Sequence, residues 1–189
     1  WQATVAAWIV NLSDEPASAD FSVSVAGTKL EFPHTTLQPG TNRLTGEIAI
    51  AGVEAWSPEN PALFTLDARL SHSDGRDDWK DRVGFREVKT EGNQILLNGR
   101  PIFLQGFNRH EDHPDHGCAI PLSIMRKDLE LIRHAGANAV RTSHYPNDER
   151  FLDLCDELGL LVWEENHARG LFPEAVGADA GMDIHPMKH

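Results

Sequence analysis

Residues 136–166 read GANAVRTSHYPNDERFLDLCDELGLLVWEEN, and this stretch decides the fold of the second half of the chain. Two short segments with the length of strands, NAVRTS (138–143) and LLVWEE (160–165), flank an amphipathic segment. We predict that the amphipathic segment is a helix that starts at Asn147, because Asn is a favoured N-cap, and ends at Gly159. A strand, a helix and a strand at this spacing are typical of a βαβ unit with parallel strands.

The residues before this stretch extend the same pattern. Residues 95–107, ILLNGRPIFLQGF, predict a hairpin turn at the Asn-Gly pair 98–99 and then one continuous apolar strand that is covered on both faces. Residues 121–136, PLSIMRKDLELIRHAG, predict a further helix with Ser123 as its N-cap. Three strands and two helices leave strand edges unpaired and an apolar face uncovered, so we expect residues 93–165 to be the opening of a larger α/β fold.

The first 87 residues show a different rhythm. Apolar and polar residues tend to alternate in FSVSV (21–25) and LFTLDARL (63–70), and turn residues recur roughly every 8–12 positions. This pattern predicts an antiparallel β-sandwich. The Ser-Asp-Gly sequence at 73–75 predicts a hairpin in which the Asp-Gly pair supplies a positive φ. We expect the tryptophans of this half to be core residues: Trp8, Trp56 and Trp79.

The composition excludes several classes of partner. The 189 residues include 17 Lys and Arg against 29 Asp and Glu, a formal charge of −12. Nucleic acids and anionic membranes require a basic face, so we expect neither as a partner. No segment approaches the ~20 apolar residues of a transmembrane helix, and residues 1–10 lack the features of a signal peptide, which slightly favours a cytoplasmic location. Cys118 and Cys155 have no paired spacing, so we expect free thiols in the core.

Polar residues gather where the first predicted parallel strand ends, the position at which α/β folds and barrels place their sites. This segment is NRHEDHPDHG, residues 108–117. Its imidazoles could bind zinc, although Pro114 interrupts any helix that would align them. A polar ligand-binding loop is the first interpretation of this segment and a solvated loop the second, and zinc binding is the least favoured of the three. The zinc candidates are His110, His113 and His116.

The next two strands also end in polar residues. Arg141 supplies five fixed donors and His144 a donor and an acceptor, which suits carboxylates or sugar hydroxyls, and a structural Arg–carboxylate pair is the alternative. Ser143 is not expected to be a nucleophile, because no nucleophile-elbow sequence surrounds it. Glu164 and Glu165 cannot both face one site, because adjacent residues of a strand point to opposite faces. We expect one of them to face the helices or an internal salt bridge.

Three runs in this order resemble glycoside hydrolase family 2, the family of β-galactosidases, β-glucuronidases and β-mannosidases. They are WSPENPALFTL (56–66), DRVGFREVKTEGNQILLNGRPIFLQGFNRHEDHPDHG (81–117) and residues 136–166. The resemblance implies an immunoglobulin-like β-sandwich at residues 1–88 and the N-terminal part of a (β/α)8 TIM barrel at 89–189. A whole barrel needs ~250 residues, so we expect an incomplete barrel with its first three strands and two helices. Residues 166–189 have no periodic apolar run and are expected to be a loop or frayed tail.

The resemblance also implies which residues contact the sugar. Residues matching His110 and His144 line the sugar pocket in β-galactosidases, and the arginine matching Arg141 helps to orient the catalytic carboxylates. Asn108 would follow the first barrel strand and Asn166 the third. The substrate-binding residues implied by the resemblance are Asn108, His110, Arg141, His144 and Asn166.

The catalytic pair of the family does not carry over to this chain. Its acid/base glutamate belongs to an Asn-Glu motif after a later barrel strand, and no Asn-Glu pair occurs at 166–189. Retaining glycosidases need two carboxyl groups about 5–5.5 Å apart, so we expect no catalytic residue here and no hydrolysis by the chain alone. Residues 167–169 read His-Ala-Arg where the β-galactosidase subgroup has a Glu-x-His magnesium site, so we expect no metal and no cofactor.

The chain is therefore expected to be a fragment of a retaining β-glycosidase, with β-galactose as the first candidate sugar. A β-glucuronidase fragment and a non-catalytic carbohydrate-binding or interaction module are the alternatives. The expected partners are a carbohydrate and either a second chain with the missing barrel segment or further copies of this chain.

Overall fold

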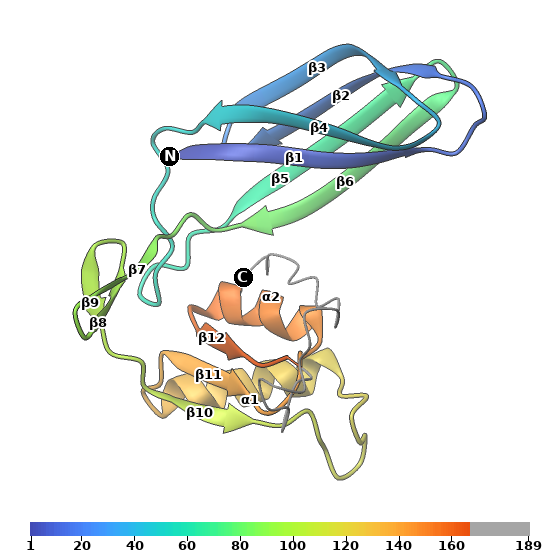
Figure 1. Ribbon diagram of the computed structural model, residues 1–189. Coiled ribbons are helices and arrows are strands. Elements are labelled where there is room, and N and C mark those ends of the chain that lie inside the picture. Colours follow the sequence, from blue (N-terminus) through green and yellow to red (C-terminus); the bar gives the residue numbers. More distant parts are fainter. Residues whose placement is uncertain (167–189) are drawn as a thin grey trace, which may run out of the picture. The chain divides into compact units, whose positions relative to one another are not determined.

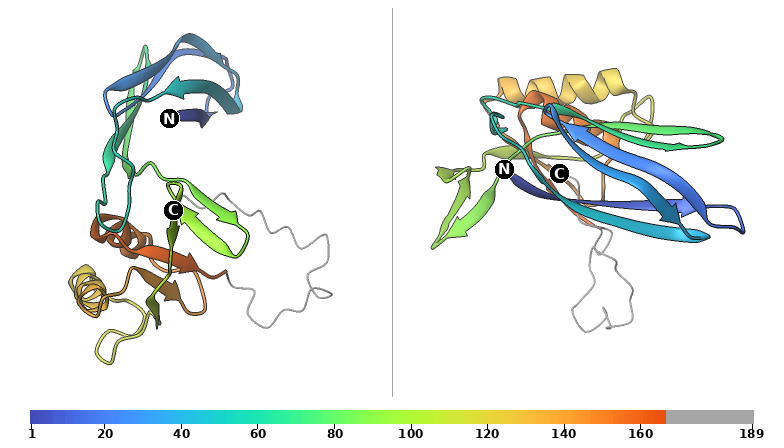
Figure 2. Two further views of the ribbon diagram at one scale, coloured as in Figure 1. Left: turned by 90° about the vertical axis from the view of Figure 1, so that its left-hand side faces the viewer. Right: turned by 90° about the horizontal axis from the view of Figure 1, so that it is seen from above.

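The computed structural model describes residues 1–166 and divides into two compact units. The first contains residues 1–55 and 62–85, and the second contains, of the described residues, 56–61 and 86–166. Figures 1 and 2 show strands alone in the first unit and both described helices in the second. In the described part of the chain, neither helix is long and apolar enough to cross a membrane.

The first unit is built from six antiparallel strands in two sheets. One sheet pairs β1 (Gln2–Asn11) with β4 (Gly40–Ala49), and the other has the order β3-β2-β5-β6. The strands of the second sheet are β2 (Ala17–Val25), β3 (Thr28–Leu37), β5 (Phe64–His72) and β6 (Gly75–Val83). Ile9 of β1 shares one apolar cluster with Phe21 and Val23 of β2, so the two sheets enclose a common core. The antiparallel β-structure predicted for this half is confirmed.

Two predicted details of this half are wrong. Residues 73 and 74 connect β5 and β6 in a hairpin, but Gly75 does not take a positive φ, because it opens β6 opposite His72. Trp8 and Trp79 are 64% and 48% exposed rather than core residues. Trp8 is on the outward face of β1, since its neighbours Ala7 and Ile9 pack into the core. Trp79 lies on β6, which is the edge strand of its sheet.

The second unit begins with a small antiparallel sheet of three strands: β7 (Val88–Glu91), β8 (Gln94–Leu97) and β9 (Arg100–Ile102). Asn98 and Gly99 connect β8 and β9 with φ values of 51° and 75°, which a type I′ hairpin requires. The continuous strand predicted after this turn is wrong, because it breaks beyond β9. There the side chain of Asn138 donates to the carbonyl of Phe103 and accepts from the N–H of Gln105, both at 2.9 Å, in place of a neighbouring strand.

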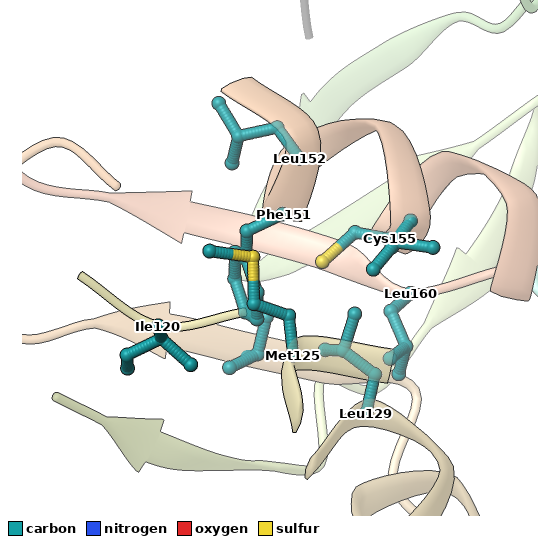
Figure 3. Packing of buried hydrophobic residues seen from close by; sticks show 9 residues of the cluster. Ile120, Met125, Leu129, Phe151, Leu152, Cys155 and Leu160 are labelled. Atoms are coloured by element: carbon teal, nitrogen blue, oxygen red, sulfur yellow. The ribbon is translucent and has the colours of Figure 1, made fainter. Parts of the chain in front are cut away.

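Three parallel strands and two helices follow in the predicted order. They are β10 (Gly106–Arg109), α1 (Leu122–His134), β11 (Ala139–Thr142), α2 (Glu149–Leu158) and β12 (Leu161–Glu164). β11 lies between β10 and β12. Figure 3 shows the core between sheet and helices, in which Leu129, Phe151 and Cys155 are fully buried. This burial raises the pKa of the Cys155 thiol, whereas Cys118 is exposed and the prediction of a core thiol there is wrong.

Both predicted N-caps are wrong. The N-cap of α1 is Pro121, which makes no side-chain hydrogen bond, and Ser123 lies within the helix. The N-cap of α2 is Asp148, whose Oδ1 accepts from the backbone N–H of Arg150 at 2.9 Å. Asn147, the residue predicted for this role, is buried. Its side chain accepts from Arg109 and donates to the carbonyl of Tyr145, so it does not cap the helix.

The end of α2 is as predicted. Gly159 takes the left-handed conformation with φ of 72°. A Cβ at this position would lie 2.4 Å from the carbonyl oxygen of Pro58, so the site requires glycine for space as well as for conformation. Trp56, two residues before Pro58, also contacts α2, because its Nε1 donates to the carbonyl of Asp156 at 2.9 Å.

We expect Leu129→Ala to lower the free energy of unfolding of the second unit by about 2–5 kcal/mol, because its side chain is 0% exposed in the core. The free energy of unfolding is measured by urea titration with the helical circular dichroism signal as the probe, since both described helices lie in that unit. Leu131→Ala is the matched control on the same helix. Its side chain is 59% exposed, so the change should stay within about 0.5 kcal/mol. Equal losses in the two variants would contradict the described core.

Candidate functional site

The parallel register determines which side chains share a face of the sheet. Residues that are register partners across β10, β11 and β12 project their side chains from the same face of the sheet. One such row is Asn108, Arg141 and Trp163. The next row, on the opposite face, is Arg109, Thr142 and Glu164.

Arg141 is at the centre of the first row. Its Nε and Nη2 donate to Oε1 of Glu165 at 2.9 and 2.7 Å. Its Nη1 donates to Oδ1 of Asn108 at 3.1 Å and to Oγ of Ser143 at 3.4 Å. The guanidinium thus connects residues at the ends of all three strands. The side chains of Arg141 and Glu165 are 37% and 26% exposed, so the ion pair is accessible from outside.

Two imidazoles complete this cluster. Nδ1 of His144 lies 3.0 Å from Oε2 of Glu165 and 3.3 Å from Nη2 of Arg141. The ring of His110 stands nearly edge-on to the His144 ring, with 5.4 Å between the ring centres. The cluster therefore offers amide, imidazole, guanidinium and carboxylate groups at one edge of the sheet, a combination suited to a ligand rich in hydroxyl groups.

The structure brings together most of the residues predicted to bind substrate: Asn108, His110, Arg141 and His144. Asn166, the remaining one, directly follows Glu165 and is exposed. Glu165 belongs to the cluster but was not predicted as a site residue. Its position two residues beyond Trp163, on the face of Arg141, is the signal that could have identified it.

The two adjacent glutamates separate as the alternation rule predicts. Glu165 binds Arg141, whereas Oε1 of Glu164 accepts from the backbone N–H of Asn147 at 3.3 Å. The hydrogen bonds from Arg141, and after them the one from His144, hold the pKa of Glu165 below its ordinary value of 4.5. Glu165 is therefore an ionised carboxylate at neutral pH.

Arg109 supports the site from the opposite face of the sheet. Its guanidinium is 6% exposed and lies over the ring of Phe151 of α2, at 4.2 Å from the ring centre. Nε donates to Asp128 of α1 at 3.1 Å, and Nη1 donates to Asn147 at 3.3 Å. Nη2 is buried without a hydrogen-bond partner among the described residues. One buried cation thus connects the end of β10 to both helices.

The loop after β10 holds the other two histidines. The rings of His113 and His116 lie 4.9 Å apart, and Nδ1 of His113 accepts from the backbone N–H of Asp115. Within residues 1–166, no three metal-binding side chains come together. His110 lies beside His144 and Tyr145 instead.

We expect Glu165→Gln to lower stability at neutral pH and to lose that effect in acid. A carboxylate whose pKa is lowered by folding stabilises the native state above its unfolded pKa, near 4.5, and this contribution disappears as the pH falls through the lower folded pKa. Urea midpoints measured from neutral pH to well below 4.5 test this. Glu164→Gln is the adjacent control, and a Glu165→Gln deficit that persists unchanged in acid would contradict the ion pair.

Comparison with known proteins follows the same division of the chain. The described residues form a unit of antiparallel strands and a unit with three parallel strands, two helices and a polar cluster at the strand ends. Residues 3–86 match the family described as Glycosyl hydrolases family 2, and residues 88–185 match its TIM barrel domain. The chain belongs to glycosyl hydrolase family 2, and this confirms the resemblance found in the sequence.

Several relatives are enzymes of this family. A crystal structure of a GH2 β-galacturonidase from Eisenbergiella tayi bound to galacturonate is 46% identical, with a TM-score of 0.82, and the match covers 94% of this chain and 32% of that one. The β-galactosidase of Pseudoalteromonas haloplanktis is 40% identical over 67% of this chain and 12% of its own length. A putative β-glucuronidase of Formosa agariphila is 45% identical over 61% and 14%. The chain thus spans a small part of the length of its curated relatives.

Proposed function

We propose that this protein hydrolyses terminal β-linked sugars and that β-galactosides are its first candidate substrates. The observation that carries the proposal is the cluster at the strand ends, in which a partly exposed Arg141–Glu165 ion pair is joined by His144 and Asn108. Side chains of these types bind sugar hydroxyls. The β-galactosidases among the relatives support the same class of reaction.

The charges in the cluster favour a neutral sugar. A uronate carboxylate requires a cation of its own. In the described cluster, the guanidinium of Arg141 faces Glu165, and on the opposite face Arg109 is buried against Asp128. Neither arginine is left to pair with a uronate, so galactose fits this part of the site better than galacturonate.

β-Galacturonides are the second candidate substrates. The solved β-galacturonidase is similar over nearly the whole of this chain. Galactose and galacturonate have the same ring configuration and differ at C6, so the same cluster could bind either ring. A cation contributed from outside the described residues would then select the uronide.

We further propose that this chain supplies one side of the site and does not hydrolyse glycosides alone. In this proposal residues 1–88 are an immunoglobulin-like sandwich domain, and residues 89–189 are the first part of a (β/α)8 barrel. Retaining hydrolysis needs a proton donor and a nucleophile about 5–5.5 Å apart. Glu165 is poorly suited to donate a proton, because Arg141 and His144 stabilise its ionised form. The catalytic pair would come from later barrel strands.

The activity is tested with aryl β-glycosides. The full-length protein that carries these domains should hydrolyse 4-nitrophenyl β-galactoside faster than the corresponding β-galacturonide and β-glucuronide. The 189-residue chain should show no turnover in a preparation free of host glycosidases. Faster turnover of the galacturonide would establish the second candidate, and turnover by the chain alone would refute the proposed origin of the catalytic pair.

Sugar binding is tested by calorimetry on the 189-residue chain. We expect methyl β-galactoside to bind with a Kd on the order of 1 mM, about −4 kcal/mol, as befits one side of a site. His144→Ala should abolish this binding. His134→Ala is the control, because His134 is exposed at the end of α1. Binding that survives His144→Ala would indicate a carbohydrate-binding surface elsewhere on the chain.

A further inference from the structure

The two polar neighbours of His144 Nδ1 require different protonation states of that nitrogen. Oε2 of Glu165, at 3.0 Å, is a carboxylate oxygen and can only accept a hydrogen bond. Nη2 of Arg141, at 3.3 Å, can only donate one. A single ring nitrogen cannot donate to the first and accept from the second, so the stronger contact decides where the proton is.

The contact with Glu165 is the stronger one. It is shorter, and an N–H donating to a carboxylate is a charge-assisted hydrogen bond. Nη2 of Arg141 already donates to Oε1 of the same carboxylate at 2.7 Å, so Arg141 does not depend on the imidazole as an acceptor. An unprotonated Nδ1 would hold its lone pair against an ionised oxygen at 3.0 Å, a repulsive contact. Nδ1 of His144 therefore carries a proton.

The carboxylate is itself fixed in place. The backbone N–H of Glu165 donates to Oγ1 of Thr142 at 3.1 Å, and Thr142 is fully buried. Oε1 of Glu165 accepts two hydrogen bonds from Arg141, and Oε2 of Glu165 is directed at His144. Glu165 is thus held through its backbone N–H and through Oε1, independently of the contact between Oε2 and the imidazole.

We propose that Glu165 is a positioning residue of the sugar site, which keeps Nδ1 of His144 protonated and presents the unprotonated Nε2 as an acceptor for a sugar hydroxyl. Within residues 1–166, no group hydrogen-bonds to Nε2 of His144. A neutral ring with its proton on Nδ1 has its lone pair on Nε2, which accepts a hydroxyl proton. The nature of the ligand rests on the proposed function, whereas the position of the proton rests on the contacts of Glu165 alone.

The test is a ring 15N–1H correlation spectrum of the 15N-labelled 189-residue chain, at a pH where imidazoles are neutral. The signals of His144 are identified by their loss in His144→Gln. We expect a protonated Nδ1 and an unprotonated Nε2. Glu165→Gln keeps the size of the side chain but removes its charge, and should shift the tautomer ratio of His144 toward Nε2–H by about tenfold. Nε2–H in the unmodified chain, or an unchanged ratio in Glu165→Gln, overturns the proposal.

Glu164→Gln is the matched control, because Glu164 is adjacent but points to the opposite face. It should leave the tautomer ratio of His144 unchanged, and an equal shift there would overturn a specific role of Glu165. Helical circular dichroism verifies that each variant is folded.

Titration with methyl β-galactoside separates this proposal from the proposed function. Bound sugar should move the Nε2 resonance of His144 more than the Nδ1 resonance. Sugar that binds without moving Nε2 overturns the acceptor role. If the sugar does not bind, the proposed function fails, and the spectra of the sugar-free chain still decide whether Glu165 sets the tautomer.

Discussion

Arg109, Thr142 and Glu164 stand side by side on one face of the parallel sheet, and the alternate row containing Asn108 and Arg141 faces the other way. A slip of one residue in any of these strands would exchange its two faces. The buried guanidinium of Arg109 opposes such a slip, because its acceptors Asp128 and Asn147 lie on the helix side. A buried charge that loses its partner costs about 3–5 kcal/mol. The geometry of the candidate site depends on this register.

Two arginines at the ends of neighbouring strands therefore have different roles. Arg109 is almost fully buried and connects β10 to the two helices. Arg141 is more than a third exposed, and its ion pair with Glu165 is partly solvated. Partly solvated pairs add little to stability, about 0–1 kcal/mol. The contribution of the Arg141–Glu165 pair is thus mainly to orient donors and acceptors, including the ring of His144, at the edge of the sheet.

The sequence predicted the order of elements better than their ends. Gly159 and the Asn-Gly turn at 98–99 are where they were expected, because these glycines take the positive φ that a helix end and a tight turn require and that other residues adopt at a cost. The N-cap of α2 was misplaced because the buried Arg109 needs an acceptor, and Asn147 supplies it, which leaves the cap to Asp148. The strand predicted to reach residue 107 breaks because Asn138, about 35 residues away, binds its backbone.

By itself the sequence determined that polar clusters follow three parallel strands and that Glu164 and Glu165 face opposite sides, because the alternation of side chains along a strand is a local property. Its motifs also identified the family. Only the tertiary structure decided that Glu165 is the glutamate that joins Arg141 and that His110 lies beside His144. These partners come from different strands, 24 positions apart for Arg141 and Glu165, and their meeting depends on the register between strands, which no local pattern encodes.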